Sequence, residues 1–200
     1  MALIKLNDRA VKDVTQFGSI SSLGSLVHIS TATASSSASI EFTSGIDSTY
    51  KEYVFYFVNI HPQTDDAQFQ FNLSTDSGSN YNVTKTSSVF GAAHAENDSV
   101  ASLSYDTGLD LAQSTNFQSL NLASFDNDHG ISGTLQIFNP SSSTYVKHYI
   151  AVNNTTNYDN LNLVKYVAGY GNTTSPVDAI KFQMSSGNID SGQILLFGVN

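Results

Sequence analysis

Apolar and polar residues alternate with a period of two along most of this chain. In 68–73, QFQFNL, every second residue is apolar, which is the pattern of a strand with one buried face. The segments 38–43 and 180–184 repeat this alternation. Two other segments, 53–60 and 194–199, are apolar at odd-numbered and even-numbered positions alike. Such strands are typical of a sheet that is covered on both sides.

The alternation predicts about eleven strands, separated by loops that are rich in Gly, Pro, Asn and Ser. Short strands joined by such loops are typical of sandwiches and jelly rolls. We therefore expect an all-β protein: an antiparallel β-sandwich, jelly-roll-like, with a single sandwich domain over residues 25–200. The strands are drawn from twelve candidate ranges, of which 100–105 has the weakest pattern: 26–31, 37–43, 51–60, 66–74, 81–90, 100–105, 116–124, 131–138, 144–152, 161–170, 177–184 and 190–199.

Residues 1–24 follow a different period. Apolar side chains recur there at spacings of three and four, with Asp8 as a candidate N-cap, which predicts a short helix or arm. This segment either plugs one end of its own sandwich or docks on a neighbouring subunit. An exposed arm with so many apolar residues would be an interaction site. The docking hypothesis assigns assembly to Leu3, Ile4, Leu6, Val11, Val14 and Phe17.

Charge narrows the range of partners. Only 12% of the 200 residues are charged, and 17 Asp and Glu outnumber 8 Lys and Arg, which gives a formal net charge of −9. This balance argues against capture of nucleic acid or of an anionic membrane surface. No run approaches the roughly 20 apolar residues of a membrane helix, and the first residues lack the apolar core of a signal peptide. We therefore expect folding in a cytosol.

Candidate chemistry is sparse. The chain has no cysteine, no HExxH pair among its five histidines and no GxSxG motif, so we expect no enzyme and no cofactor. The segment DNDHG at 126–130 resembles the start of a calcium loop, but its twelfth position is Ile137 rather than Glu. This segment is therefore either an Asx-rich turn or an irregular loop site for an ion. The carboxylates of Asp106 and Asp110 could serve a depolymerase.

Loop residues could also bind a saccharide. A tyrosine ring can stack on a sugar, and neighbouring amides and carboxylates can bond its hydroxyls. The candidate ligand loops are those that contain Tyr81, Asp126, Asp128 and Tyr158.

Several blocks of the sequence resemble one group of proteins. These are LNDRAVKDVT at 6–15 with FGS at 17–19, FTSGIDSTYKEY at 42–53, NIHP at 59–62, FNPSS at 138–142 and MSSGNIDSG at 184–192. Together they are similar to virion structural or tail-fibre-like proteins of marine tailed phages. The resemblance implies placement in a virion and supplies no catalytic residue.

We therefore expect a non-enzymatic structural protein of a tailed phage virion, either a capsid decoration or a tail or fibre component. It would fold and assemble in the host cytoplasm as a homo-oligomer, such as a trimer, and contact other virion proteins. Symmetry mates would cover its arms and edges. The alternative is a host-surface carbohydrate or receptor-binding module of a phage fibre.

Overall fold

Strands account for all the regular secondary structure in the part of the chain that the computed structural model describes, which is residues 26–124, 126, 128–157 and 160–200. No helix occurs in that part. The helix or arm predicted within residues 1–24, with its assembly residues Leu3 to Phe17, lies outside the described residues. The strands are β1 (Leu26–Thr33), β2 (Ile40–Phe42), β3 (Glu52–Pro62), β4 (Ala67–Ser74), β5 (Lys85–Ala95), β6 (Ala101–Tyr105), β7 (Gln118–Ala123), β8 (Ile131–Phe138), β9 (Lys147–Thr156), β10 (Leu161–Gly171), β11 (Ala179–Met184) and β12 (Ile189–Val199).

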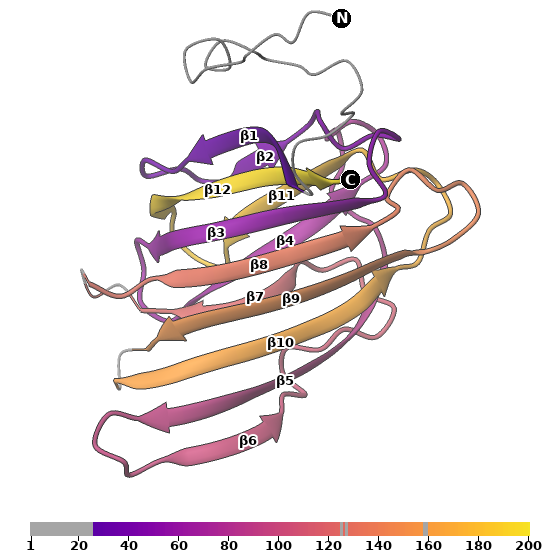
Figure 1. Ribbon diagram of the computed structural model, residues 1–200. Coiled ribbons are helices and arrows are strands. Elements are labelled where there is room, and N and C mark those ends of the chain that lie inside the picture. The colour runs from indigo at the N-terminus through magenta and orange to yellow at the C-terminus, as the bar shows by residue number, and fades with distance from the viewer. Residues whose placement is uncertain (1–25, 125, 127, 158–159) are drawn as a thin grey trace, which may run out of the picture.

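These strands form two antiparallel sheets that pack face to face (Figure 1). The larger sheet has the order β1-β12-β3-β8-β9-β10-β5-β6, and the smaller has the order β2-β11-β4-β7. The four strands β1-β12-β3-β8 lie opposite β2-β11-β4-β7, and the chain alternates between the two sets. This is the double Greek-key order of a jelly roll. The prediction of an antiparallel, jelly-roll-like β-sandwich is therefore confirmed.

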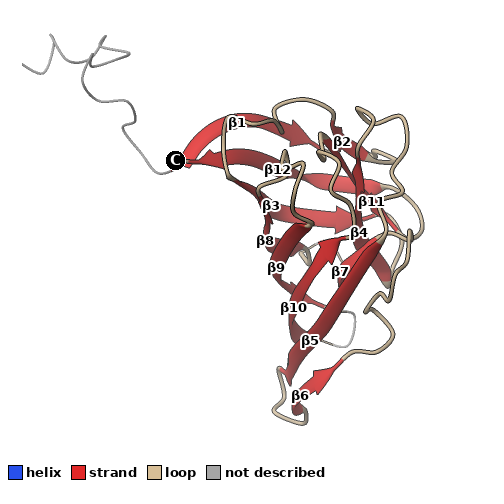
Figure 2. Cartoon of the chain, turned by 90° about the vertical axis from the view of Figure 1, so that its right-hand side faces the viewer, coloured by secondary structure: helices blue, strands red, loops and turns tan. Residues whose placement is uncertain are grey.

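Two hairpins extend the larger sheet. β5 and β6 come from the connection between β4 and β7, while β9 and β10 come from the connection between β8 and β11. Both add to the β8 side of the larger sheet, in the order β9-β10-β5-β6. In Figure 2 the end of the sheet at β5 and β6 reaches past the smaller sheet. The added strands still pack in part on the smaller sheet, since the Tyr149 ring of β9 lies 5.1 Å from that of Phe71 of β4, and only the β6 end of the larger sheet extends past it.

The core follows the alternation in the sequence. Tyr53, Phe55 and Phe57 of β3 point between the sheets and are at most 2% exposed. Phe182 of β11 faces them from the smaller sheet, and its ring centroid lies 5.4 Å from those of Phe55 and Phe57. It also stacks on Phe69 of β4 at 5.7 Å. Phe182 thus joins the two sheets at their centre.

Two lysines are buried in the sandwich, and within the described residues their ammonium groups donate to an amide oxygen and to backbone carbonyl oxygens. Lys85 donates to Asn72 Oδ1 at 2.5 Å and to the Val83 carbonyl oxygen at 2.8 Å. Burial lowers the pKa of Lys85 to about 7. Lys147 donates to loop carbonyl oxygens, the nearest being that of Tyr145 at 2.6 Å, and burial lowers its pKa too. Both ammonium groups hold loop backbone in place.

Strand bounds differ from the predicted ranges at a few places. The weakly patterned range 100–105 is a strand, β6, whereas the range 81–90 is shifted to Lys85–Ala95. Residues just before β5 are held as a loop because the Asn72 side-chain amide donates to the Tyr81 carbonyl oxygen at 2.7 Å. This bond replaces a ladder partner, and a buried amide on a strand cannot be recognised from alternation alone.

Candidate functional site

The first candidate site is the outer face, defined here as the side of the larger sheet that points away from the smaller one (Figure 1). Strand register places one residue from each of six neighbouring strands in a single row across this face. Side chains in such a row contact their cross-strand neighbours. The row is Tyr56, Thr134, Val152, Tyr166, Phe90 and Tyr105.

Much of this face is apolar and open to solvent. The Phe90 and Tyr166 rings stack with their centroids 5.0 Å apart and their planes 3° apart. Of the nine large hydrophobic residues that are exposed in the described part of the chain, six lie here, on β3, β5, β6, β9 and β10. Contiguous exposed patches of this kind mark interaction sites. The six are Val58, Phe90, Leu103, Tyr105, Ile150 and Tyr166.

The outer face is also nearly free of charge. Along β3, β5, β6, β8, β9 and β10, all within the described residues, the outward positions hold no Asp, Lys or Arg, and only Glu52 at the first residue of β3. Residues 1–25 contain three of the eight Lys and Arg and two of the seventeen Asp and Glu, so the rest of the chain carries −10. A strongly acidic body therefore presents one uncharged face.

Cover on both sides was expected for the strand that contains 53–60. The structure provides full cover on one side, where Phe55 and Phe57 are buried against the smaller sheet, and partial cover on the outer face: Val54 is buried and the Tyr56 ring packs edge-on against Phe197, while Val58 is 42% exposed. Cover by the described residues therefore ends before Val58, and the outer face stays open from there across β9, β10, β5 and β6. We take this mismatch as the main functional signal of the fold.

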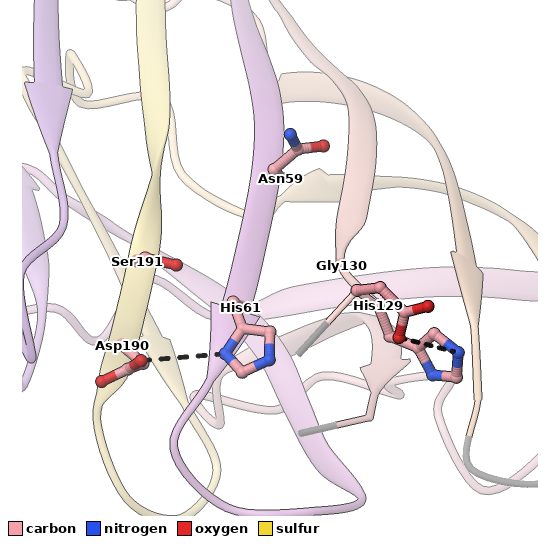
Figure 3. Close-up of a pocket in the computed structure, with 7 residues that line it drawn as sticks. Asn59, His61, His129, Gly130, Asp190 and Ser191 are labelled. Carbon is pink, nitrogen blue, oxygen red and sulfur yellow. Dashed lines mark ion pairs between the residues drawn. The ribbon is translucent and has the colours of Figure 1, made fainter. Parts of the chain in front are cut away.

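The second candidate site is a polar pocket of about 430 Å³, here called the His61 pocket (Figure 3). It forms where β3 and β12 both depart from regular pairing, because register shifts occur between Phe57 and Ile60 and on both sides of Ser191. Bulges of this kind are common beside functional sites. The lining residues are Asn59, His61, Asp128, His129, Gly130, Asp190 and Ser191.

Local backbone constraints open this pocket. Asn59 has a left-handed φ of 49°, and Gly192 has a φ of 114°. A Cβ at Gly192 would lie 2.8 Å from Ile60 Cα, so the close approach of β12 to β3 requires glycine there. The same local geometry turns the His61 side chain toward Asp190 on the neighbouring strand (Figure 3).

Imidazoles and carboxylates face one another in the His61 pocket. His61 Nδ1 lies 3.9 Å from Asp190 Oδ2, and His61 Nε2 donates to the Asp126 carbonyl oxygen at 3.1 Å. His129 lies 3.6 Å from Asp126 Oδ2 and 3.9 Å from Asp128 Oδ1. No group of three or more His, Asp or Glu suited to a metal ion is found among the described residues. The arrangement can donate and accept hydrogen bonds to a ligand rich in hydroxyl groups.

The predicted ligand-loop residues are brought together only in part. Asp126 and Asp128 meet around His129 at this pocket. Tyr81 has another environment, since its hydroxyl donates to Glu41 Oε2 at 3.2 Å and the Lys181 ammonium lies 5.6 Å from its ring. Burial, followed by the Glu41 charge, raises the pKa of Tyr81 to about 12. Tyr158 lies outside the described residues.

The carboxylates considered for a depolymerase already have partners within the fold. Asp106 Oδ2 lies 2.6 Å from the Lys165 ammonium, and Asp110 Oδ2 accepts from the Tyr105 hydroxyl at 2.7 Å. Both contacts attach the loop after β6 to the sheet. This arrangement gives the two carboxylates a structural part in holding that loop.

Sequence reasoning missed residues of both sites. Asn59, His61 and Asp190 meet only through the pairing of β3 with β12, so no local motif could have indicated the pocket. The outer face could have been recognised in the sequence, because the segment 161–170 is apolar at odd-numbered and even-numbered positions around Val164 and Tyr166. The same pattern was recognised only in 53–60 and 194–199.

Comparisons with known proteins add nothing to this description: no protein-family model, no curated protein and no solved structure matches the chain. Within the described residues there is no helix with the length and hydropathy of a membrane span.

Proposed function

We propose that this protein is a non-enzymatic structural subunit that assembles with copies of itself through the outer face. The observation that carries the proposal is the exposed, apolar and nearly uncharged surface on a body whose formal charge is −10. Copies of such a body repel one another over most orientations. Contact through the one uncharged face removes apolar surface from water without bringing carboxylates together.

The size of the face is adequate for a stable contact. Six strands spaced by about 4.8 Å, each contributing about eight residues at roughly 3.3 Å, span an area near 750 Å². A standard interface buries about 800 Å² on each partner. The stacked Phe90 and Tyr166 rings lie in the row that crosses this area, and aromatic side chains are favoured as anchors of protein interfaces.

We further propose that the assembly is part of a tailed phage virion, where the chain would be a capsid decoration or a tail or fibre component. The support is the sequence resemblance together with the fold, since jelly rolls are common in viral capsid domains. Detection of the chain by proteomic analysis of purified particles of the encoding phage supports this placement. Its absence from the particles, with expression in the infected cell, contradicts it.

Self-association is tested by a matched pair of substitutions. Tyr166→Lys places a charge in the centre of the outer face, whereas Tyr145→Lys changes a loop side chain that is 68% exposed. Light scattering coupled to gel filtration is expected to give a multiple of 21.5 kDa for the parent and for Tyr145→Lys, and a lower mass for Tyr166→Lys. Equal masses for all three contradict the role of the outer face.

A second function, recognition of a host-surface saccharide, is favoured by the His61 pocket. Asn59, His61, Asp128 and Asp190 present donors and acceptors toward one volume. The described lining residues include no Tyr or Phe on which a sugar ring could stack, which ranks this function second. A glycan array should give signals that disappear with Asp190→Ala but persist with Asp76→Ala, a distant loop change. A blank array contradicts it.

A further inference from the structure

β6 forms one edge of the larger sheet and has a row of backbone groups with no backbone partner among the described residues. The Asp106 amide donates to the Val89 carbonyl oxygen, and the Ala95 amide donates to the Val100 carbonyl oxygen. Because bonded positions alternate along an antiparallel ladder, Ser102 and Ser104 are the residues of β6 that bond to β5. The N–H and C=O groups of the alternate residues, at positions 101, 103 and 105, therefore point outward from the sheet.

The other edges of the two sheets are less open. β1 has a register shift between His28 and Ser30, which bends that edge. In the smaller sheet, β2 has only three residues and β7 is buried at all but one of its positions. β6, by contrast, is exposed at each of its five residues and contains no Pro, Gly or charged residue. Such an edge is a template for pairing with another strand.

The sequence of β6 is suited to pairing with itself. It reads ASLSY, so the three central residues, Ser102, Leu103 and Ser104, have the same order in both directions. In an antiparallel pair centred on Leu103, each leucine would face its own counterpart, and Ala101 would face Tyr105 of the second copy. A pair of this kind has two-fold symmetry and closes on itself.

We propose that two copies of the chain join edge to edge through β6, about a two-fold axis at Leu103. About six backbone hydrogen bonds would form between the outward groups of the two strands. The larger sheets would become one continuous sheet, and the aromatic rows of the two outer faces would lie on the same side. This inference rests on the proposed self-association and adds a second contact to it, because the edge pair joins two chains side by side and leaves their outer faces free to meet those of another pair.

Charge determines how the pairing responds to salt. The strand itself is uncharged, but Asp98 precedes it and Asp106 follows it. In the pair, the Asp106 end of one strand approaches the Asp98 end of the other. Lys165 lies 2.6 Å from Asp106 and offsets part of this repulsion. The association is therefore expected to strengthen as salt concentration rises, because salt screens the remaining carboxylates.

A cysteine cross-link tests the pairing directly, because the chain has no cysteine of its own. In Leu103→Cys, the two introduced residues would have Cα atoms about 5.5 Å apart, which a disulfide can span. Mild oxidation should convert most of this variant to a covalent dimer on a non-reducing gel. Tyr145→Cys, an exposed loop control, should remain monomeric on the same gel. No cross-link with Leu103→Cys, or equal cross-linking of both variants, overturns the inference.

Leu103→Pro provides the complementary loss of pairing. The N–H of Leu103 points away from β5, so a proline at this position removes no hydrogen bond to β5. Proline is tolerated at such edge positions. The variant should keep the parent circular dichroism spectrum but dimerise at least roughly tenfold more weakly, about 1.4 kcal/mol. An unchanged dissociation constant overturns the pairing.

The outcomes separate this inference from the proposed function. If the parent is oligomeric and neither change at Leu103 has an effect, association through the outer face stands and the edge pairing through β6 is wrong. If the parent stays at 21.5 kDa, both proposals fail. If a peptide of residues 1–25 competes with the cross-link, the edge receives that segment rather than β6 of a second copy. The edge pair gives an even-numbered assembly, so a trimeric mass also contradicts it.

Discussion

Phe182 gives the sharpest test of the core, because its ring is the contact between the two sheets. The side chain is fully buried, and its ring lies within 6.4 Å of five other phenylalanine rings, with only one of these pairs stacked in parallel. Phe182→Ala removes these contacts and leaves a cavity bounded by both sheets. Substitutions of this type cost about 3–5 kcal/mol. The rigid ring cluster limits collapse, so we expect about 4 kcal/mol.

The assay is urea denaturation followed by fluorescence and circular dichroism, with thermal unfolding as a second measure. For a domain of this size, 4 kcal/mol corresponds to a fall in Tm of roughly 8–16 °C. Phe182→Leu keeps most of the volume and should cost less than about 1.5 kcal/mol. Tyr145→Ala, at a loop side chain that is 68% exposed, should change stability by under about 0.5 kcal/mol. If Phe182→Ala costs no more than Tyr145→Ala, the assigned core is wrong.

Three further predictions concern other parts of the chain. The pKa of Lys85 is about 7 in the folded protein and has the ordinary lysine value of about 10.4 in the unfolded chain. Between these two pH values the unfolded chain therefore binds more protons than the folded one. Stability should therefore rise by roughly 1–2 kcal/mol from pH 7.5 to 9.0, and Lys85→Met should remove most of that rise; an equal slope in urea titrations of both proteins refutes the assignment. Gly169→Ala should cost about 1–3 kcal/mol in the same assay, because its Cβ would clash with the Thr86 carbonyl oxygen of β5 and lie 2.7 Å from the Tyr149 hydroxyl. Gly108→Ala, where the nearest atom is 3.5 Å away, should be nearly neutral, and equal costs for the two variants would contradict this packing. Deletion of residues 1–17 should lower the oligomeric mass in light scattering if the apolar N-terminal segment docks on a neighbour, and an unchanged mass defeats the docking-arm hypothesis.

The alternation of side chains was sufficient to predict the class of fold. Residues such as Phe55, Phe57 and Phe69 carry both the strand period and the burial, because one buried face in an antiparallel sheet imposes a period of two. The order of the strands needed the structure. The hairpins β5–β6 and β9–β10 lie within connections of the jelly roll, and nothing local distinguishes them from its own strands.

The candidate sites were less accessible to sequence reasoning. Asp126 and Asp128 were recognised from their spacing, but their neighbours His61 and Asp190 come from strands that are far apart in the sequence. Buried Lys85 was not predicted either, since lysine on a strand is ordinarily exposed. In each case the environment of the side chain is set by strands that are distant in the sequence, and a local sequence pattern cannot predict which strands those are.

The most direct test of the account is the mass of the unaltered chain in solution. Sedimentation equilibrium over a range of concentrations measures this without a variant or a label. The uncharged, apolar outer face predicts a mass that reaches a multiple of 21.5 kDa and holds that value as salt is raised, because burial of apolar surface does not depend on attraction between charges. A mass of 21.5 kDa at every concentration up to about 100 µM, equivalent to an association weaker than roughly 5.5 kcal/mol, would contradict it.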